Sequence, residues 1–354
     1  MRIALVTDAW FPQVNGVVRT LDSVVRLLRQ WGHEILVISP DQYRSVPAPS
    51  YPEIRLAVTR ARTIGKQIEE FGAEAVHLST EGPLCIQARR WCLRKNMPFT
   101  TAYHTQFPEY LAKRTKLSPR IFWPYIRWFH RKSEAIMVST ESVRSQLREK
   151  RLPHVHHWSR GVDLDNFCAD APSPPIYREI EHPIQLYVGR VAVEKNIEAF
   201  LQTDQPGSKV VVGDGPALED LQARYPDAHF VGRKSGRELA GYYAGADVFV
   251  FPSKTDTFGL VIIEALACGT PVAAYPVTGP VDILTANCGV MDDDLNVAIQ
   301  RALKLDSADC VAHGGDYHWD ASANQFLAGL VPQQQRLEYH LSRRILAKAI
   351  FARV

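Results

Sequence analysis

The chain has 354 residues, of which 46% are hydrophobic, so it can bury two cores and we expect two domains of about 150 to 180 residues. Its net charge of +3 is too small to indicate a nucleic-acid-binding protein. The six cysteines form no CxxC pair, which is typical of reduced, mostly buried thiols in a cytosolic protein. No apolar run reaches about 18 residues and the N-terminus leads directly into a strand, so neither a signal peptide nor a membrane-spanning helix is expected.

Residues 1–170 are predicted to form an α/β domain. A buried parallel strand at 2–7 precedes an amphipathic helix, whose inward face carries Val18, Leu21, Val25 and Leu28. Further strands are predicted at 34–38, 54–58, 75–79, 99–102 and 135–139. Gly16, at the start of the first helix, is a candidate contact for a diphosphate, although a single glycine turn is weak evidence. Asp8, in the loop after the first strand, either contacts an acceptor or caps the turn.

His104 directly follows the predicted strand at 99–102. This position places it at the carboxyl end of the sheet, where open α/β folds bind ligands. A histidine after a strand can equally be a structural residue. His104 is therefore a candidate site residue that needs support from elsewhere in the chain.

Residues 89–132 have the most unusual composition. Glu109 is the one carboxylate set against eleven cations: Arg89, Arg90, Arg94, Lys95, Lys113, Arg114, Lys116, Arg120, Arg127, Arg131 and Lys132. Aromatic residues are interleaved with them, among them Trp91, Phe107, Tyr110, Phe122, Trp123, Tyr125, Trp128 and Phe129. This pattern favours contact with an anionic membrane surface over nucleic acid, which uses the same residue types. The alternative is that many rings lie in the core and the charges form a solvated face.

A proline-rich linker at 171–175 opens the predicted second domain, residues 171–332. Its first strand, at 183–188, leads into a glycine turn that is followed by Arg190 and Lys195. Two cations that converge on a cleft can neutralise a diphosphate, the arginine as a fork and the lysine as a point charge. Val231 and Gly232 end another predicted strand, and we expect their main-chain groups to lie beside a nucleotide base.

Residues 253–271 are the most informative stretch of the chain. A strand at 247–252 leads through a short loop into a helix predicted at 258–267, and Pro271 begins the next strand. The amides at the helix start, with the helix dipole and Gly259, form a candidate phosphate site. Asp256 and Glu264 flank it, and we expect the former to accept hexose hydroxyls and the latter ribose hydroxyls. The alternative is an ordinary helix with one capping aspartate and one exposed glutamate.

This stretch, with Phe-Gly between two acidic residues and Glu-Ala-Leu-Ala-Cys-Gly-Thr-Pro-Val after, resembles the signature of family 4 retaining glycosyltransferases. The resemblance implies an α/β fold of the GT-B type, in which two Rossmann-like domains face each other across a cleft. It implies roles at the donor diphosphate for Gly16, Arg190 and Lys195, and a role near the donor sugar for His104. The family usually has Glu where this chain has Asp256.

The resemblance further implies a metal-independent enzyme that needs no cofactor, since the nucleotide-sugar is its donor substrate. The residues predicted to act in the transfer are His104, Arg190, Lys195 and Asp256. The residues predicted to bind the donor are Gly16, Arg190, Lys195, Val231, Gly232, Asp256, Phe258, Gly259, Leu260 and Glu264. Metal ligands are not predicted.

We therefore expect a retaining transferase that moves a hexose from GDP-mannose, a UDP-hexose or a UDP-hexuronate to a membrane lipid, such as diacylglycerol or a glycolipid. We expect it in the cytoplasm, bound peripherally to the inner face of the plasma membrane through residues 89–132. Residues 333–354 are predicted to form a basic amphipathic helix that packs back on the first domain.

Three alternatives compete with this function. The acceptor could be soluble or a polysaccharide, or the protein could be a non-catalytic, membrane-associated relative of the enzymes. A Rossmann oxidoreductase is disfavoured because no G-x-G-x-x-G follows either opening strand.

Overall fold

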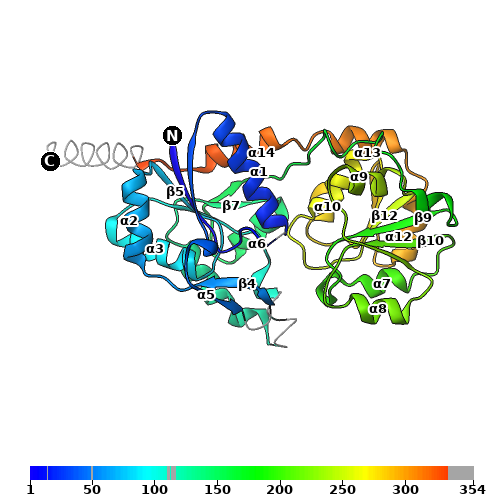
Figure 1. Ribbon diagram of the computed structural model, residues 1–354, viewed down its shortest axis with the longest axis horizontal. Coiled ribbons are helices and arrows are strands. Elements are labelled where there is room, and N and C mark those ends of the chain that lie inside the picture. Colours follow the sequence, from blue (N-terminus) through cyan, green and yellow to red (C-terminus); the bar gives the residue numbers. More distant parts are fainter. Residues whose placement is uncertain (14, 49–50, 110–111, 113–116, 334–354) are drawn as a thin grey trace, which may run out of the picture.

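The computed structural model describes residues 1–13, 15–48, 51–109, 112 and 117–333. It contains two α/β halves, each built on a six-stranded parallel sheet (Figure 1). The first sheet has the order β2-β1-β5-β6-β7-β8. Its strands are β1 (Arg2–Val6), β2 (Glu34–Ile38), β5 (Ala75–Leu78), β6 (Thr100–Ala102), β7 (Ile136–Val138) and β8 (Val155–His157). An antiparallel hairpin lies beside it, formed by β3 (Ser45–Ala48) and β4 (Tyr51–Ala57).

Helices cover the first sheet because their apolar residues recur at the helical period. They are α1 (Gly16–Gln30), α2 (Ala61–Phe71), α3 (Pro83–Lys95), α5 (Trp123–His130) and α6 (Glu141–Glu149). In α1 the residues Val18, Leu21, Val25 and Leu28 are buried, as their spacing predicts. The side chain of Asn15 begins this helix by accepting hydrogen bonds from the amides of Val17 and Val18 at 3.0 and 3.1 Å.

The second sheet has the order β11-β10-β9-β12-β13-β14. Its strands are β9 (Ile184–Val188), β10 (Ser208–Val212), β11 (His229–Gly232), β12 (Val248–Phe251), β13 (Val272–Ala274) and β14 (Gly289–Met291). In chain order this is the 3-2-1-4-5-6 arrangement of a Rossmann sheet, whose strand order reverses between β9 and β12. The helices are α7 (Ile197–Leu201), α8 (Leu218–Arg224), α9 (Gly236–Ala244), α10 (Leu260–Ala267), α11 (Pro280–Ile283), α12 (Leu295–Ala302) and α13 (Ser307–Gly314).

The last described helix, α14 (Trp319–Gly329), returns to the first half and lies beside α1 (Figure 1). Its residues Ala323 and Phe326 are fully buried in the core that contains Trp158. The predicted second domain, residues 171–332, included this segment, but its apolar face completes the first core. The helix predicted at 333–354 falls almost wholly outside the described residues. Along the described part of the chain, no helix combines the length and the apolar character needed to cross a bilayer.

Candidate active site

The strand reversal between β9 and β12 brings two loops of the second domain together. Arg190 follows β9 after a single residue, Gly189. Lys195 ends a short 3-10 helix in the same loop (Val193–Lys195), and Asp256 lies in the loop after β12. Lys195 Nζ donates a hydrogen bond of 2.6 Å to Asp256 Oδ1. The two side chains are 28% and 24% exposed. The structure therefore brings three predicted site residues to one edge of the sheet, and it joins two of them in an ion pair.

Helix α10 begins at the same edge. It starts at Leu260, two residues later than predicted, after Gly259 in a left-handed conformation with φ of 91°. A Cβ on Gly259 would lie 3.0 Å from Ile262 Cδ1 and 3.1 Å from Phe251 Cζ, so the turn favours glycine on both counts. Among the residues that the structure describes, no side chain caps the first amides of α10. An uncapped helix start with its partial positive charge is suited to an anionic group.

The ring of Phe258 does not face this edge. It is buried in the core of the second domain and contacts the edge of Tyr317 at a centroid distance of 6.0 Å. Its predicted role at the donor would therefore rest on main-chain atoms.

Glu264 lies one turn into α10 and is 2% exposed, so the alternative of an exposed surface glutamate is wrong. Tyr243 Oη donates to its Oε2 at 3.1 Å, and Arg19 Nη2 of α1 donates to its Oε1 in a close ion pair. The Glu264 charge raises the pKa of Arg19, while burial and the same carboxylate raise the pKa of Tyr243. The ion pair between Arg19 and Glu264 joins the two domains. Neither Arg19 nor Tyr243, the two donors to Glu264, was a predicted site residue.

Gly16 faces the start of α10 from the other domain. A Cβ on Gly16 would stand 3.5 Å from Leu260 Cδ1. Because Gly16 and Leu260 are the first residues of α1 and α10, two helix N-termini meet across the cleft. Their dipoles add a positive potential to that of the two cations.

His104 lies in the loop after β6 and is held from both domains. Its carbonyl accepts a hydrogen bond of 2.5 Å from Thr257 Oγ1 of the second domain. Its Nδ1 lies 3.0 Å from Arg160 Nη2. Because a guanidinium only donates, Nδ1 must accept, and the ring proton resides on Nε2. Burial and the Arg160 charge lower the pKa of His104 well below its usual range.

The Nε2–H of His104 is buried and has no hydrogen-bond partner among the residues that the structure describes. Its chemistry is that of a neutral donor, because a ring with a depressed pKa and one protonated nitrogen neither carries charge nor accepts at Nε2. Arg160 is itself fixed by bonds from Nη1 to the carbonyls of Trp158 and Ser159, at 2.7 and 3.2 Å.

Val231 and Gly232 end β11, the edge strand on the far side of β10. The carbonyl of Gly232 accepts a hydrogen bond of 3.0 Å from the Gly213 amide. Gly232 has φ of 71°, and a Cβ there would meet no atom within 4 Å. The backbone is thus open to approach at this point, at the same carboxyl edge as Arg190.

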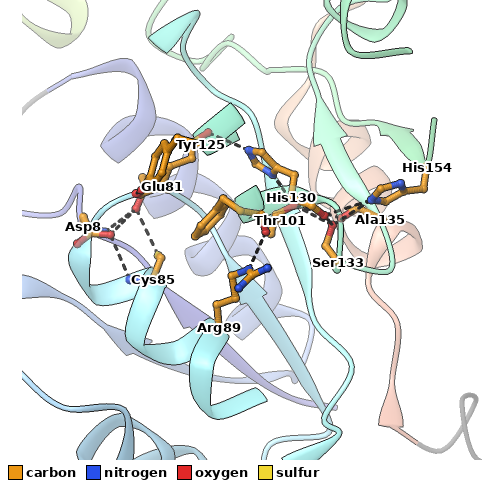
Figure 2. Close-up of polar contacts among 12 residues, drawn as sticks. Asp8, Glu81, Cys85, Arg89, Thr101, Tyr125, His130, Ser133, Ala135 and His154 are labelled. Atoms are coloured by element: carbon orange, nitrogen blue, oxygen red, sulfur yellow. Dashed lines mark hydrogen bonds and ion pairs between the residues drawn. The ribbon is translucent and has the colours of Figure 1, made fainter. Parts of the chain in front are cut away.

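The carboxyl edge of the first sheet carries a separate polar cluster (Figure 2). Asp8 accepts from the Leu84 amide at 2.8 Å, from Thr80 Oγ1 at 2.9 Å and from the Cys85 amide at 3.3 Å. Asp8 thus caps the start of α3, not the turn of its own loop as one sequence interpretation had it, and a contact with an acceptor stays a prediction. Despite these bonds, burial raises the pKa of its carboxyl group.

Next to Asp8, Glu81 and the buried His130 join α5 to the end of β5 (Figure 2). His130 Nε2 lies 3.1 Å from Glu81 Oε1, and its Nδ1 lies 2.9 Å from Thr101 Oγ1. Tyr125 Oη donates to the Glu81 carbonyl. Sequence analysis missed this cluster, although Asp8 and Glu81 both follow strands that border the point where the order of the first sheet reverses.

The segment 89–132 divides between core and surface. Trp91, Trp123 and Phe129 are buried, as the competing interpretation allowed. Arg89 is buried too, and it donates to the carbonyls of Phe129 and Trp128 at 2.9 and 2.6 Å, which fixes the end of α5 (Figure 2). Tyr110, Lys113, Arg114 and Lys116 lie outside the described residues.

Comparison with known proteins agrees with this geometry. Residues 14–166 match the model of Glycosyltransferase Family 4, and residues 182–305 match that of Glycosyl transferases group 1. The chain is 32% identical over 309 residues to a GDP-mannose-dependent alpha-mannosyltransferase of Mycobacterium tuberculosis, covering 80% of this chain and 82% of that protein. It is 27% identical over 314 residues to an alpha-monoglucosyldiacylglycerol synthase of Streptococcus pneumoniae, covering 78% and 71%.

Among solved structures, the fold is similar to sucrose-phosphate synthase from Thermosynechococcus elongatus, with a TM-score of 0.73 and 21% identity over 98% of this chain and 99% of that one. The two Rossmann-like halves and their cleft define a GT-B glycosyltransferase. The chain belongs to glycosyltransferase family 4, and it is a hexosyltransferase. The family and fold predicted from the sequence are confirmed.

Proposed function

We propose that the enzyme transfers a hexose from a nucleoside diphosphate sugar to a membrane lipid, with retention of the anomeric configuration. The observation that carries this proposal is the convergence of Arg190, Lys195 and the uncapped start of α10 where the second sheet reverses its order. These groups are all positive, as the binding of a diphosphate requires. The carboxylates of Asp256 and Glu264 lie on the adjoining loop and helix, where sugar and ribose hydroxyls need acceptors.

In the proposed reaction the bond between the anomeric carbon and the diphosphate oxygen breaks, and the electron pair stays on that oxygen. Arg190, Lys195 and the amides of Gly259 and Leu260 would stabilise the developing charge, each donor contributing roughly a hundredfold or more in rate. The acceptor hydroxyl attacks the same face of the sugar, and its proton passes to the departing phosphate. This scheme uses neither a metal ion nor a cofactor.

The side chains of this chain would have distinct roles in that scheme. Lys195 would exchange its bond to Asp256 for the diphosphate and leave Asp256 to accept from hexose hydroxyls. His104 would donate its Nε2–H to an oxygen of the sugar. Glu264 is held by Arg19 and Tyr243, which would fix its carboxylate for the ribose. Main-chain groups of Val231 and Gly232 would lie beside the base.

A lipid acceptor is supported by two observations. Relatives of this chain include an alpha-monoglucosyldiacylglycerol synthase, whose named product is a glycosylated lipid, and the first domain has an exposed basic surface on α3, with Arg90, Arg94 and Lys95. Because the proposed acceptor is a membrane lipid, we propose that the enzyme binds peripherally to the cytoplasmic face of the membrane. GDP-mannose is the first donor to test, because GDP-mannose is in the name of a relative that matches four fifths of the chain.

The test is transfer by the purified protein from GDP-mannose, UDP-glucose, UDP-galactose and UDP-glucuronate, each with diacylglycerol vesicles. Transfer from one donor, lost in Glu264→Gln but retained in the exposed control Lys304→Ala, would establish reaction and sugar together. Donor hydrolysis without transfer to lipid would contradict the lipid acceptor and favour a soluble one. Binding of all donors without any turnover would contradict the enzymatic assignment itself.

A further inference from the structure

One outward stripe of α5 carries a pocket that the proposed reaction does not use. Pro124, Arg127, Trp128 and Arg131 recur at the i, i+3, i+4 and i+7 spacing that places residues on one helix face. Together with Arg151, they line a surface pocket of about 430 Å³. The opposite face of α5 carries Trp123, Ile126 and Phe129 in the core. The pocket therefore belongs to the outer face of an anchored helix.

The three arginines of the pocket lack an acidic partner among the residues that the structure describes. Arg144 of α6 pairs with Glu141, whereas the ion pairs of the described residues include none of Arg127, Arg131 and Arg151. No acidic side chain lines the pocket. The pocket thus presents three guanidinium groups with no carboxylate among its lining residues, and a bound anion would neutralise their charge.

A further feature shows that positive charge is concentrated here. Arg89 lies behind the pocket with its guanidinium 4.3 Å from the centre of the Trp128 ring, and burial together with the charges of Arg131 and Arg90 lowers its pKa. Arg151 reaches the pocket from the end of α6, where its left-handed φ of 64° belongs to the helix cap closed by the Leu152 amide on the Leu147 carbonyl.

We propose that this pocket binds the phosphodiester of an anionic phospholipid headgroup and so docks the first domain on the membrane; this rests on the proposed lipid acceptor. Arginine forks match phosphate oxygens. Trp128, 37% exposed, and Ile121, 58% exposed, add an aromatic ring and an apolar side chain on and just before the same helix. An exposed isoleucine can insert into the interface of a bilayer, whereas it would add nothing to the binding of nucleic acid or of a soluble phosphate.

Docking through α5 would also orient the site. The other side of this helix holds the carboxyl edge of the first sheet, through His130 to Glu81 and through Tyr125 to the Glu81 carbonyl (Figure 2). A lipid phosphate held on the outer face of α5 is thus one helix away from the edge that faces the cleft. The acceptor domain would meet the membrane in a fixed orientation rather than through diffuse charge.

The test compares vesicle binding of the full chain and two double variants. Arg131→Gln/Arg151→Gln removes two exposed pocket charges, and Arg62→Gln/Lys66→Gln removes two exposed charges from α2 as the matched control. Cosedimentation with phosphatidylcholine vesicles containing phosphatidylglycerol, at about 0.15 M salt, measures the affinity. At roughly fivefold per cation, we expect the pocket variant to bind about 25-fold more weakly and the control to bind nearly as tightly as the parent. Thermal unfolding checks that both variants fold.

Three further arms identify the ligand. Vesicles in which oleate supplies the negative charge should bind at least about fivefold more weakly than those with phosphatidylglycerol, because a carboxylate offers fewer oxygens to the three forks. Glycerol phosphate and a single-stranded oligonucleotide serve as soluble competitors, and neither should displace the protein from vesicles at micromolar concentration.

Several outcomes would overturn the proposal. Equal weakening of both double variants would show diffuse charge instead of a pocket. Equal binding to oleate vesicles would show that the pocket does not recognise the phosphate of the headgroup. Tight binding of glycerol phosphate or of the oligonucleotide, lost in the pocket variant, would assign the pocket to a soluble ligand or to nucleic acid. Because binding is measured without any nucleotide-sugar, failure of the proposed reaction would not affect this result.

Discussion

The carboxyl edges of the two sheets share a topology but use their charged groups differently. At the first edge, Asp8 is buried and saturated by two amides and a hydroxyl, and Glu81 is held by His130. At the second edge, Lys195 and Asp256 form a partly exposed ion pair, and no described side chain caps the start of α10. Position at a strand end is therefore insufficient to define a site. The binding edge differs in that its charged groups stay partly exposed and its helix amides have no side-chain cap among the described residues.

The largest expected effect is on the cations of the second edge. Lys195→Ala and Arg190→Ala should each lower kcat/KM about 100- to 1000-fold, because each removes a donor aimed at the leaving diphosphate. Their melting temperatures should change little, since Lys195 lies in a partly exposed pair. Lys304→Ala on the exposed surface is the control. If stability fell in proportion to turnover, Lys195 and Arg190 would be assigned to maintaining the fold, as Asp8 is at the first edge.

A second prediction concerns Arg160, which fixes the ring of His104. Arg160→Met should lower kcat/KM about 10- to 100-fold, comparable to losing the outer-shell partner of a metal-bound histidine. Nitrogen-15 NMR of the His104 ring should show the Nδ1–H tautomer appearing in this variant. Arg160→Lys keeps a donor, so it should restore part of kcat/KM and part of the Nε2–H tautomer population. Full activity in Arg160→Met with the tautomer changed would show that the Nε2–H has no part in transfer.

The first edge can be tested at Asp8. Asp8→Ala should cost about 1 to 3 kcal/mol of unfolding free energy, because the amides of Leu84 and Cys85 lose their acceptor. Asp8→Asn keeps one oxygen and should cost less. Urea unfolding measures both variants. A large loss of turnover in Asp8→Asn with unchanged stability would instead assign Asp8 to the acceptor, and would erase the contrast between the edges.

The histidines buried in the first domain should make stability depend on pH. Burial lowers the pKa of His77 to about 3 and also lowers that of His104. Between the unfolded pKa of about 6.5 and the folded value, the unfolded chain binds the proton and the folded chain does not. Stability should therefore fall as pH falls below about 6.5, by about 1.4 kcal/mol per pH unit for each histidine.

Unfolding measured between pH 7 and 5 checks this slope, with His77→Gln expected to lower it. The same depressed pKa predicts that the pH profile of kcat shows no ionisation of His104 in this range. A limb near pH 6.5 that disappears in His104→Gln would contradict the neutral-donor role.

Much of the second edge was predictable from sequence because its signals are local. Glycine turns, cations after a strand and an acidic pair across a helix start all lie within short stretches at 189–196 and 256–264. The pairing of Arg19 with Glu264 could not be predicted, since they lie 245 positions apart and the residues around each give no indication of the other. The only hint in the sequence was that Arg19 lies three residues after Gly16.

Composition could not divide the segment 89–132 between core and surface, for a related reason. Interleaved rings and cations have the same composition whether the rings point outward or inward, and only packing shows that Trp91, Trp123 and Phe129 are core residues. The sequence around Arg89 did not indicate that its guanidinium donates to two carbonyls some forty residues away. The cap that Asp8 supplies to α3 is equally non-local, since 76 residues lie between Asp8 and Leu84.

The return of α14 to the first core has a consequence for the order in which the protein is made. The second domain is, in effect, an insertion within the first, because Ala323, Phe326 and Leu330 fill a core begun by Ile3 and Leu5. On the ribosome, the second sheet can close as soon as it emerges, whereas the first must wait for nearly the last residues described. A chain ended after Gly314 should therefore keep a protease-resistant second domain and lose resistance in the first.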